Sequence, residues 1–461
     1  MKKVFLSALV LSTMAMEAQQ SFSGFRESPY AGVLQATTNP AYMISSKRSW
    51  DANLFLVNFD LANNAIKMDT GLMNSFNDYT RSDANNPLLS HNINAKLNID
   101  VLGPSLFVKI NNQHTVGIFS RVRALGNVRN FDAKLLQSIF ADGKDLDLTQ
   151  PYNLSLNDQE IAAHIFSEIG FSWAGELYFD GHNAIKAGAS LKYIMGAGNL
   201  YAGFRDFNGT ASLTTDPVSK KVNLNINSTN GVFEIVNGGT DFLNNFKANS
   251  LMGKEASTIG FDLGATYEYR FDGCRTCHNK PHDLRIGFSI MDIGSVSYKT
   301  NTESYRYQMP NSGSVTLNMD EINEEKLKQA FGISNSMKMA QKTVKSSLPT
   351  TLNLSADYRI FGGLYVNASG LMNLTSKSKT DVYNAYYANT FSLTPRFDTS
   401  SFGAYLPISY NQVAKTNIGF GLRLGPLTFG SSSAISNLMK TAHELNFFVG
   451  LRFGHMAYPN N

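Results

Sequence analysis

Both cysteines of the chain lie in one motif that could attach a haem. Cys274 and Cys277 are separated by two residues, and His278 follows directly. The pattern Cys-x-x-Cys-His is the attachment motif for c-type haem. Such a haem also needs a second axial ligand, and His282 lies too close in sequence to reach the opposite face of the porphyrin easily.

Two other interpretations of this motif compete with haem. The motif falls in a turn between two predicted strands, where little protein could bury a porphyrin. A local disulfide or two free thiols in that turn is therefore favoured. Metal binding by Cys274, Cys277, His278 and His282 is the remaining alternative. We accordingly predict that the protein carries neither a cofactor nor a metal ion.

No other pattern predicts catalysis or nucleic-acid binding. Of the eight histidines, only His91, His164 and His443 lie away from the predicted short turns and the C-terminal end. None of them has an adjacent Ser/Asp pattern that suggests a nucleophile and its base. No glycine-rich phosphate loop or EF-hand motif occurs. The net charge of +4 is small for 461 residues. We predict a protein that is not an enzyme and has no nucleic-acid partner.

The segments around these residues alternate between apolar and polar positions. Residues 259–271 place Ile, Phe, Leu, Ala and Tyr at every second position, with Gly, Asp, Thr, Glu and Arg between them. Successive side chains of a strand point to opposite faces, so one face is apolar and the other polar. Soluble strands usually have about 5–6 residues, whereas barrel strands that span a membrane need about 9–11. The pattern predicts a transmembrane strand that is apolar towards lipid and polar towards the lumen.

Short turns alternate with long polar segments along the chain. Asp180-Gly181, Gly362-Gly363 and Gly425-Pro426 each join two alternating runs. The polar segments are 125–164, 197–257, 300–348 and 376–414. Outer-membrane barrels have short periplasmic turns and long extracellular loops, so this chain is predicted to be one. Some loops should carry short helices, for example helices that begin at Asn130 and Asp320.

Strand counting predicts an all-β, transmembrane antiparallel β-barrel of 12–14 strands. Strands are expected to begin near residues 50, 97, 115, 165, 184, 259, 284, 349, 364, 416, 427 and 444. A further pair could lie within 197–257, around 222–226 and 232–235. Bacterial single-chain barrels have even strand numbers.

The N-terminal residues predict export. Met1-Lys2-Lys3 precedes an apolar run over 4–16, and Ala18 offers a small residue at a cut site. That run is too short to span about 30 Å of hydrocarbon, and no later segment reaches the roughly 18 apolar residues of a membrane helix. We expect a signal peptide over 1–18, an N-terminal segment in or under the lumen over 19–49, and the barrel over 50–461.

Charged residues are expected to face the lumen. Opposite charges at such positions can pair across strands and close the barrel, or they can line a conduit for polar solutes. The paired and plugged interior is favoured. The predicted lumen charges are Arg121, Arg123, Glu168, Glu176, Lys186, Lys192, Asp262, Glu268, Arg270, Arg285, Asp357 and Arg423.

Several segments resemble known barrel families. Thr38-Asn39-Pro40-Ala41-Tyr42 resembles the Asn-Pro-Ala motif of FadL-type outer-membrane barrels. Leu348 to Leu354, Asp292 to Gly294 and Gly419 to Pro426 resemble stretches of PorV-like and uncharacterised barrels of Bacteroidota. The resemblance implies about fourteen strands, an outer-membrane location, and a plug in the lumen that carries Asn39, Pro40 and Ala41.

Two functions follow from the resemblance. A PorV-like barrel would be a docking, shuttle or accessory component that holds another envelope or secreted protein through its long loops. A FadL-like barrel would take up a hydrophobic small molecule, and would then need an apolar lumen pocket beside the N-terminal segment. Charged lumen positions and large loops favour docking. Outer-membrane lipid is a partner in either case.

Overall fold

Fourteen antiparallel strands close into a barrel. A computed structural model of the whole chain describes residues 22–68, 92–133, 151–240, 248–253, 255–273, 282–302, 304–309, 313–318 and 339–456. Within these residues, neighbours along the chain pair around the barrel, and the last strand pairs with the first from Arg48↔Met456 to Ala62↔Glu444. The predicted all-β transmembrane barrel is confirmed, and the strand number is the upper value of the predicted range.

The barrel wall contains fourteen strand positions, some of them interrupted by a short break. In order around the barrel they are β1 (Arg48–Asn63), β2 (Ile93–Leu102) with β3 (Ser105–Lys109), β4 (His114–Phe131), β6 (Gln159–Phe179), the first half of β7 (Asn183–Thr215), β9 (Ala256–Tyr269), β10 (Leu284–Ile293), β15 (Thr351–Phe361), β16 (Leu364–Asn373), β17 (Thr390–Asp398), β18 (Phe402–Tyr405) with β19 (Ile408–Asn411), β20 (Lys415–Ile418) with β21 (Phe420–Leu424), β22 (Leu427–Ser431) and β23 (Glu444–Met456).

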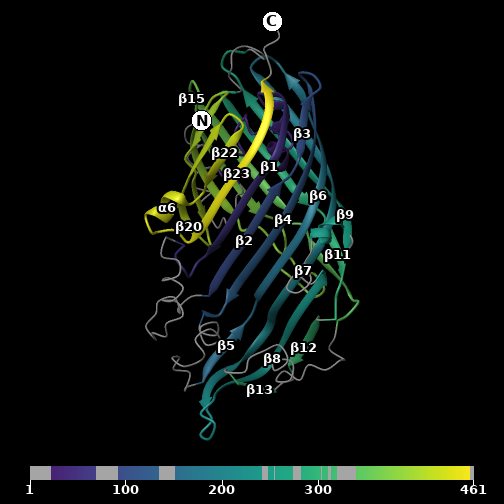
Figure 1. Cartoon of the computed structure of the whole chain (residues 1–461), viewed down its shortest axis with the longest axis vertical. Helices are drawn as coiled ribbons and strands as arrows, with labels where there is room; N and C mark the ends of the chain where they lie inside the picture. Colours follow the sequence, from purple (N-terminus) through teal and green to yellow (C-terminus); the bar gives the residue numbers. More distant parts are fainter. Residues whose placement is uncertain are drawn as a thin grey trace.

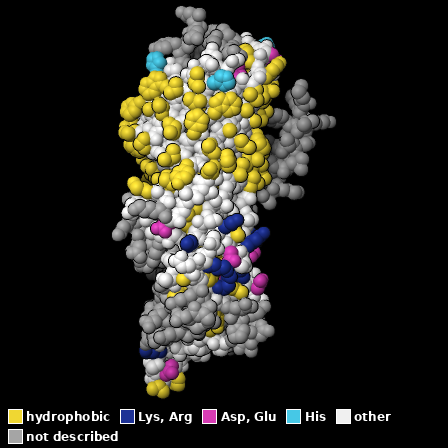
Figure 2. Space-filling view, turned by 90° about the vertical axis from the view of Figure 1, so that its right-hand side faces the viewer, with side chains coloured by type: hydrophobic (Ala, Val, Ile, Leu, Met, Phe, Trp, Pro, Cys, Tyr) yellow, Lys and Arg dark blue, Asp and Glu magenta, His cyan; other side chains and the backbone are white. Residues whose placement is uncertain are grey.

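A continuous apolar belt surrounds the barrel. In β9, Phe261 and Leu263 are about half exposed while Asp262 between them is buried, as the alternation of the sequence predicts. Figure 2 shows that such side chains form a broad band over the barrel, with charged side chains gathered beyond it. Because exposed apolar area on this scale is unfavourable in water, the belt is the lipid-facing surface of the barrel.

The predicted polar loop over 376–414 is wrong in its second half, which contains β17, β18 and β19. Pro395 lies inside β17 and Pro407 separates β18 from β19, and proline argues against a strand because it donates no ladder hydrogen bond. The sheet accommodates both prolines. The carbonyl of Pro395, for example, still accepts a hydrogen bond from the amide of Leu406 at 3.0 Å. β17 is one of the two wall positions missing from the predicted count of twelve, and β18 together with β19 is the other.

Several strands extend past the belt and form an outer extension. β7 has 33 residues, about three times what a membrane crossing needs. Its outer half pairs with β5 (Tyr152–Leu156) and β8 (Val222–Gly239), and β8 pairs with β12 (Tyr305–Met309) and β13 (Gly313–Asn318). Figure 1 shows this extension at the lower end. The segments predicted as loops over 125–164, 197–257 and 300–348 therefore contribute strands, and the expected pair over 222–235 is the single strand β8.

The two ends of the barrel differ as the sequence predicted. The short turns after β3, β6, β15 and β21 lie at the end that also holds the start of β1 and the end of β23. The predicted helix after Asp320 lies outside the described residues, as does most of that after Asn130, while Asn130 itself lies in β4. Residues 1–18 are also outside them. No helix in the described part of the chain is long and apolar enough to cross a membrane.

Candidate functional site

An N-terminal plug, residues 22–47, fills the lumen at the end with the short turns. Its apolar side chains, including Phe22, Phe25 and Met43, are almost completely buried. They form one cluster with Leu56 and Phe448 and other inward-facing residues of the wall. Two short helices, η1 (Gly32–Thr37) and α2 (Tyr42–Ser45), give the plug its compact shape. The wall begins at Arg48, close to the predicted boundary at residue 50.

Asn39 fastens the plug to the wall. Its Nδ2 donates to the carbonyl oxygens of Ala265 at 3.2 Å and Phe288 at 3.1 Å, in the neighbouring strands β9 and β10. Its Oδ1 accepts from the amide of Ala41 at 3.0 Å, which orients the side chain. An asparagine suits this position because its amide group both donates and accepts. The structure thus places the predicted plug residues together against the wall.

Glycines make room for this contact. Gly188 of β7 pairs directly with Gly264 of β9. A Cβ on Gly188 would lie 2.5 Å from the amide nitrogen of Ala41, and a Cβ on Gly264 would overlap Asn39 Oδ1. Neither Cβ fits without moving the plug backbone, so the plug can dock here only because both wall residues lack a side chain.

The aromatic residues of the plug contact a row of buried arginines from the wall. Arg285 of β10 lies 4.2 Å from the ring centroid of Tyr42, and Arg452 of β23 lies 4.8 Å from that of Phe25. Both also donate to plug carbonyls: Arg285 to Glu27 at 2.5 Å and Arg452 to Tyr30 at 2.7 Å. Cation–π contacts strengthen when both partners are shielded from water.

Tyr30 takes part in the same row. The guanidinium of Arg423 lies 4.8 Å from its ring centroid. Burial, together with the nearby carboxylate of Asp398, raises the pKa of Tyr30 to about 12, so its hydroxyl stays protonated at neutral pH. Burial also lowers the pKa of Lys47, at the end of the plug, to about 8. The sequence predicts Arg285 and Arg423 in the lumen but not Arg452, and it indicates no contact between these arginines and the plug.

A layer of ion pairs crosses the lumen beyond the plug. Arg123 of β4 pairs with Asp292 at 2.6 Å and with Glu168 at 2.8 Å. Lys192 of β7 pairs with Asp262 at 2.6 Å. Each of these side chains is buried. The prediction of a paired interior is confirmed for these residues, and removal of one partner would leave an uncompensated buried charge.

A pair of inner strands, called the inner hairpin although the chain between them also forms β12 and β13, fills the lumen on the far side of this layer. It consists of β11 (Ser295–Lys299) and β14 (Thr343–Ser347), which form a separate two-stranded sheet. Tyr298 is hydrogen-bonded through its hydroxyl to His164 Nε2 at 2.8 Å, and Ser346 Oγ lies 3.2 Å from His164 Nδ1. Val296 and Val344 join a buried cluster with Tyr383 and Tyr387. Both strands were missed from the sequence, and the alternation Val296-Ser297-Tyr298 is the signal that could have indicated β11.

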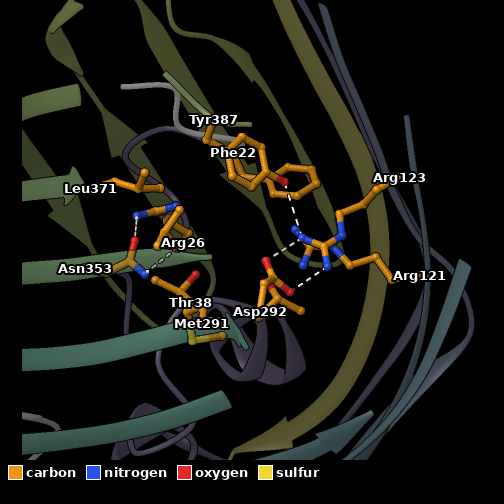
Figure 3. A pocket seen from close by; sticks show the side chains of 12 residues that line it. Phe22, Arg26, Thr38, Arg121, Arg123, Met291, Asp292, Asn353, Leu371 and Tyr387 are labelled. Carbon is orange, nitrogen blue, oxygen red and sulfur yellow. Dashed lines mark hydrogen bonds and ion pairs between the residues drawn. The ribbon is translucent and has the colours of Figure 1, made fainter. Parts of the chain in front are cut away.

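A small cavity lies between the plug and the ion-pair layer. Its volume is about 30 Å³. Figure 3 shows Arg26 of the plug on one side and Arg123 and Asp292 on the other, with the rings of Phe22 and Tyr387 close together above them. A water molecule needs at least roughly 10–15 Å³ of such volume, whereas ligand pockets have about 300–1,000 Å³. The cavity holds a water molecule or two and has no room for an organic ligand.

Comparison with known proteins places the chain in a family. The profile of a family of unknown function, DUF5723, matches residues 40–432 and so begins at Pro40 of the plug. The chain belongs to the DUF5723 family. A comparison with curated proteins found no match for this DUF5723 chain.

Similar solved structures are barrels of low sequence identity. A Pseudomonas aeruginosa FadL homologue is 11% identical with a TM-score of 0.43, covering 95% of this chain and 99% of that one. The Pseudomonas putida toluene transporter TodX is 9% identical with a TM-score of 0.40, covering 93% and 95%. The translocator domain of the autotransporter NalP from Neisseria meningitidis is 7% identical with a TM-score of 0.28, covering 88% of each chain.

The cysteine motif of this DUF5723 protein lies outside the described residues. Cys274, Cys277 and His278 fall within 274–281. His282 is described: it is buried and its Nε2 contacts the carboxylate of Asp357. The partner of His282 is thus a lumen residue of β15. No haem or metal role is assigned to the motif.

Proposed function

We propose that this DUF5723 protein is an outer-membrane barrel that serves as a docking or accessory component for another cell-envelope protein. The proposal assigns no enzymatic role, because the charged lumen residues Arg123, Asp292 and Lys192 pair with one another. An outer-membrane location fits a closed barrel with an even strand number, short turns at one end and an apolar belt.

The filled lumen is the observation that carries this proposal. The plug, the ion-pair layer and the inner hairpin follow one another along the barrel axis, and the cavity between the first two has about 30 Å³. A conduit for a hydrophobic molecule would need an apolar pocket beside the plug, and the cavity found there contains Arg26, Arg121, Arg123 and Asp292. The interior is therefore better suited to stabilising the barrel than to passing a hydrophobic molecule.

The outer extension supplies a surface for a partner. The sheet of β5, β7, β8, β12 and β13 stands beyond the belt (Figure 1), and its outermost turn carries Val218, which is 89% exposed. Its packing cluster, which includes Phe207, Leu224 and Val315, makes it a structured projection. An ordered sheet that projects beyond the membrane offers a preformed binding surface, which lowers the entropic cost of association.

Site-specific photo-crosslinking in native outer membranes tests this role. A photoreactive amino acid that replaces Val218 would crosslink to molecules at the tip of the extension. The same photoreactive amino acid in place of Phe261 would crosslink to molecules at the lipid belt. We expect one protein adduct of defined mass from position 218 and none from position 261. Absence of any protein adduct, together with a lipid-like molecule retained in purified protein, would favour transport instead.

Transport of a hydrophobic molecule is the second candidate. One observation favours it: the plug is a separate segment, attached to the wall covalently only at Arg48 and otherwise by hydrogen bonds and packing. A plug held in this way can in principle leave the lumen. Binding of a hydrophobic fluorescent probe to the purified barrel, lost when Met43 is changed to Asp, would support this alternative.

A further inference from the structure

A larger cavity opens at the outer mouth of the barrel, at the end opposite the short turns. Its volume is about 660 Å³, which lies in the range of ligand sites. The ends of β1, β2, β4 and β16, the loop over 375–388 and the turn between β19 and β20 surround it. This vestibule shares no lining residue with the small cavity described above, so the two are separate sites.

Four cationic side chains line the vestibule: Lys96, Arg129, Lys377 and Lys415. Among the described residues that line it there is no carboxylate. Three of the cations form ion pairs with carboxylates that do not line the cavity. Lys96 lies 3.5 Å from Asp60, Arg129 lies 3.2 Å from Glu160 and Lys377 lies 2.7 Å from Asp158.

Lys415 differs from the other three. It is exposed at the start of β20, and no ion pair joins it to any residue in the described part of the chain. Because carboxylates pair with the other three cations, Lys415 supplies the uncompensated positive charge, and an unpaired ammonium attracts anions. The charge of the vestibule therefore favours an anionic ligand.

Amide and aromatic side chains supply the rest of the lining. Asn64, Asn94, Asn127 and Asn373 each donate and accept one hydrogen bond within the protein, and each amide group has one further N–H and one further lone pair. Asn127 holds the backbone of Tyr386 in place, since its Nδ2 donates to the carbonyl at 3.0 Å and its Oδ1 accepts from the amide at 2.8 Å. Amides match the hydroxyl groups of sugars. Tyr386 and Tyr410 add aromatic rings to the lining, and the guanidinium of Arg129 lies 5.9 Å from the ring centroid of Tyr386.

We propose that the vestibule binds an anionic saccharide, a sugar chain that carries carboxylate or phosphate groups. The cations bind the acidic groups by charge-assisted hydrogen bonds, and the amides bind the hydroxyl groups. The headgroup of the surrounding lipopolysaccharide and a soluble acidic polysaccharide share this chemistry. The site does not depend on the docking role, because it lies outside the filled part of the lumen.

The test uses the full-length barrel in detergent micelles and measures binding by titration calorimetry. The probes are an acidic oligosaccharide (oligogalacturonate), a neutral one of equal length (maltooligosaccharide), and lipopolysaccharide. The variant is Lys377→Gln with Lys415→Gln. Lys220→Gln is the matched control, because it removes an exposed charge at the turn between β7 and β8, away from the vestibule. Heat-modifiability on gels verifies that each variant is folded.

We expect the acidic oligosaccharide or lipopolysaccharide to bind at least tenfold more tightly than the neutral chain. The double variant should weaken that binding about tenfold or more, and Lys220→Gln should leave it unchanged. Binding of lipopolysaccharide alone would identify the lipid headgroup as the ligand, and binding of oligogalacturonate would identify a soluble polymer. Equal binding of acidic and neutral chains, no binding of either anionic probe, or no effect of the double variant would overturn the proposal.

Discussion

Replacement of Gly264 by Ala should loosen the plug while it leaves the barrel intact. A Cβ at this position would overlap Asn39 Oδ1 and lie 3.0 Å from Pro40 Cδ. The plug must therefore move away from the wall. Movement breaks the two hydrogen bonds from Asn39 Nδ2 to the carbonyls of Ala265 and Phe288. The wall itself keeps its ladder, because alanine is compatible with a strand.

The magnitude follows from those two bonds. Each hydrogen bond contributes about 1 kcal/mol net, so the docked plug loses about 2 kcal/mol relative to the undocked one. At 1.4 kcal/mol for each factor of ten, the undocked population rises roughly 30-fold. Gly126→Ala in β4 is the matched control, because a Cβ there would meet only Leu97 Cβ at an ordinary 3.5 Å.

Hydrogen–deuterium exchange of the folded barrel in detergent measures this change. The amides of Tyr42, Met43 and Ser46 donate to carbonyls within the plug and exchange only when that segment opens. In Gly264→Ala they should exchange roughly 30-fold faster than in the wild type, which is the same population shift. Gly126→Ala should match the wild type. Equal exchange in all three proteins would refute the reasoning, because the glycine would then not be needed for docking.

Three further perturbations test other parts of the structure. Phe261→Lys places a charge in the lipid belt and should lower the stability of the folded barrel in liposomes by about 2–4 kcal/mol. Val218→Lys at the exposed tip should leave this stability unchanged. Gel heat-modifiability measures the folded fraction of each variant. Tyr298→Phe removes the hydrogen bond to His164 and should lower the protection of the inner hairpin from exchange by about 1–3 kcal/mol; unchanged protection would contradict the contact. Replacement of Cys274 and Cys277 together by Ser should leave folding and insertion intact, because strand pairing and lipid burial hold the barrel together. A Soret band that survives denaturation of the wild type and vanishes in the double variant would reverse that interpretation.

The sequence predicted those features that depend on local periodicity. Alternation over 259–271 is visible because the belt and the lumen impose opposite chemistry on successive residues, and β9 has this pattern in the structure. The difference in loop length between the two ends was visible because short turns and long polar segments alternate between the alternating runs. Pro395 and Pro407 hid β17, β18 and β19, since a proline interrupts the local signal even where neighbouring strands keep the pairing.

The contacts inside the lumen could be predicted only in part. Asn39 and Pro40 indicated a segment off the sheet, but the opposing Gly188 and Gly264 are 76 residues apart in sequence and meet only through strand register. The arginine row joins strands that begin at residues 284 and 444, and its members became neighbours of the plug only on closure. Apart from the strand residues expected over 222–235, the outer extension was missed because polar strands that lie beyond the membrane lack the apolar belt positions.

A conductance measurement in planar lipid bilayers tests the central claim, that the lumen of this DUF5723 barrel is filled. Purified wild-type protein should insert without a steady ion current, since plug, ion-pair layer and inner hairpin leave a cavity of only about 30 Å³ between the first two. A variant lacking both the plug and the inner hairpin, verified as folded, serves as the open reference. A steady current through the wild type, comparable to that of the open reference, would contradict the account.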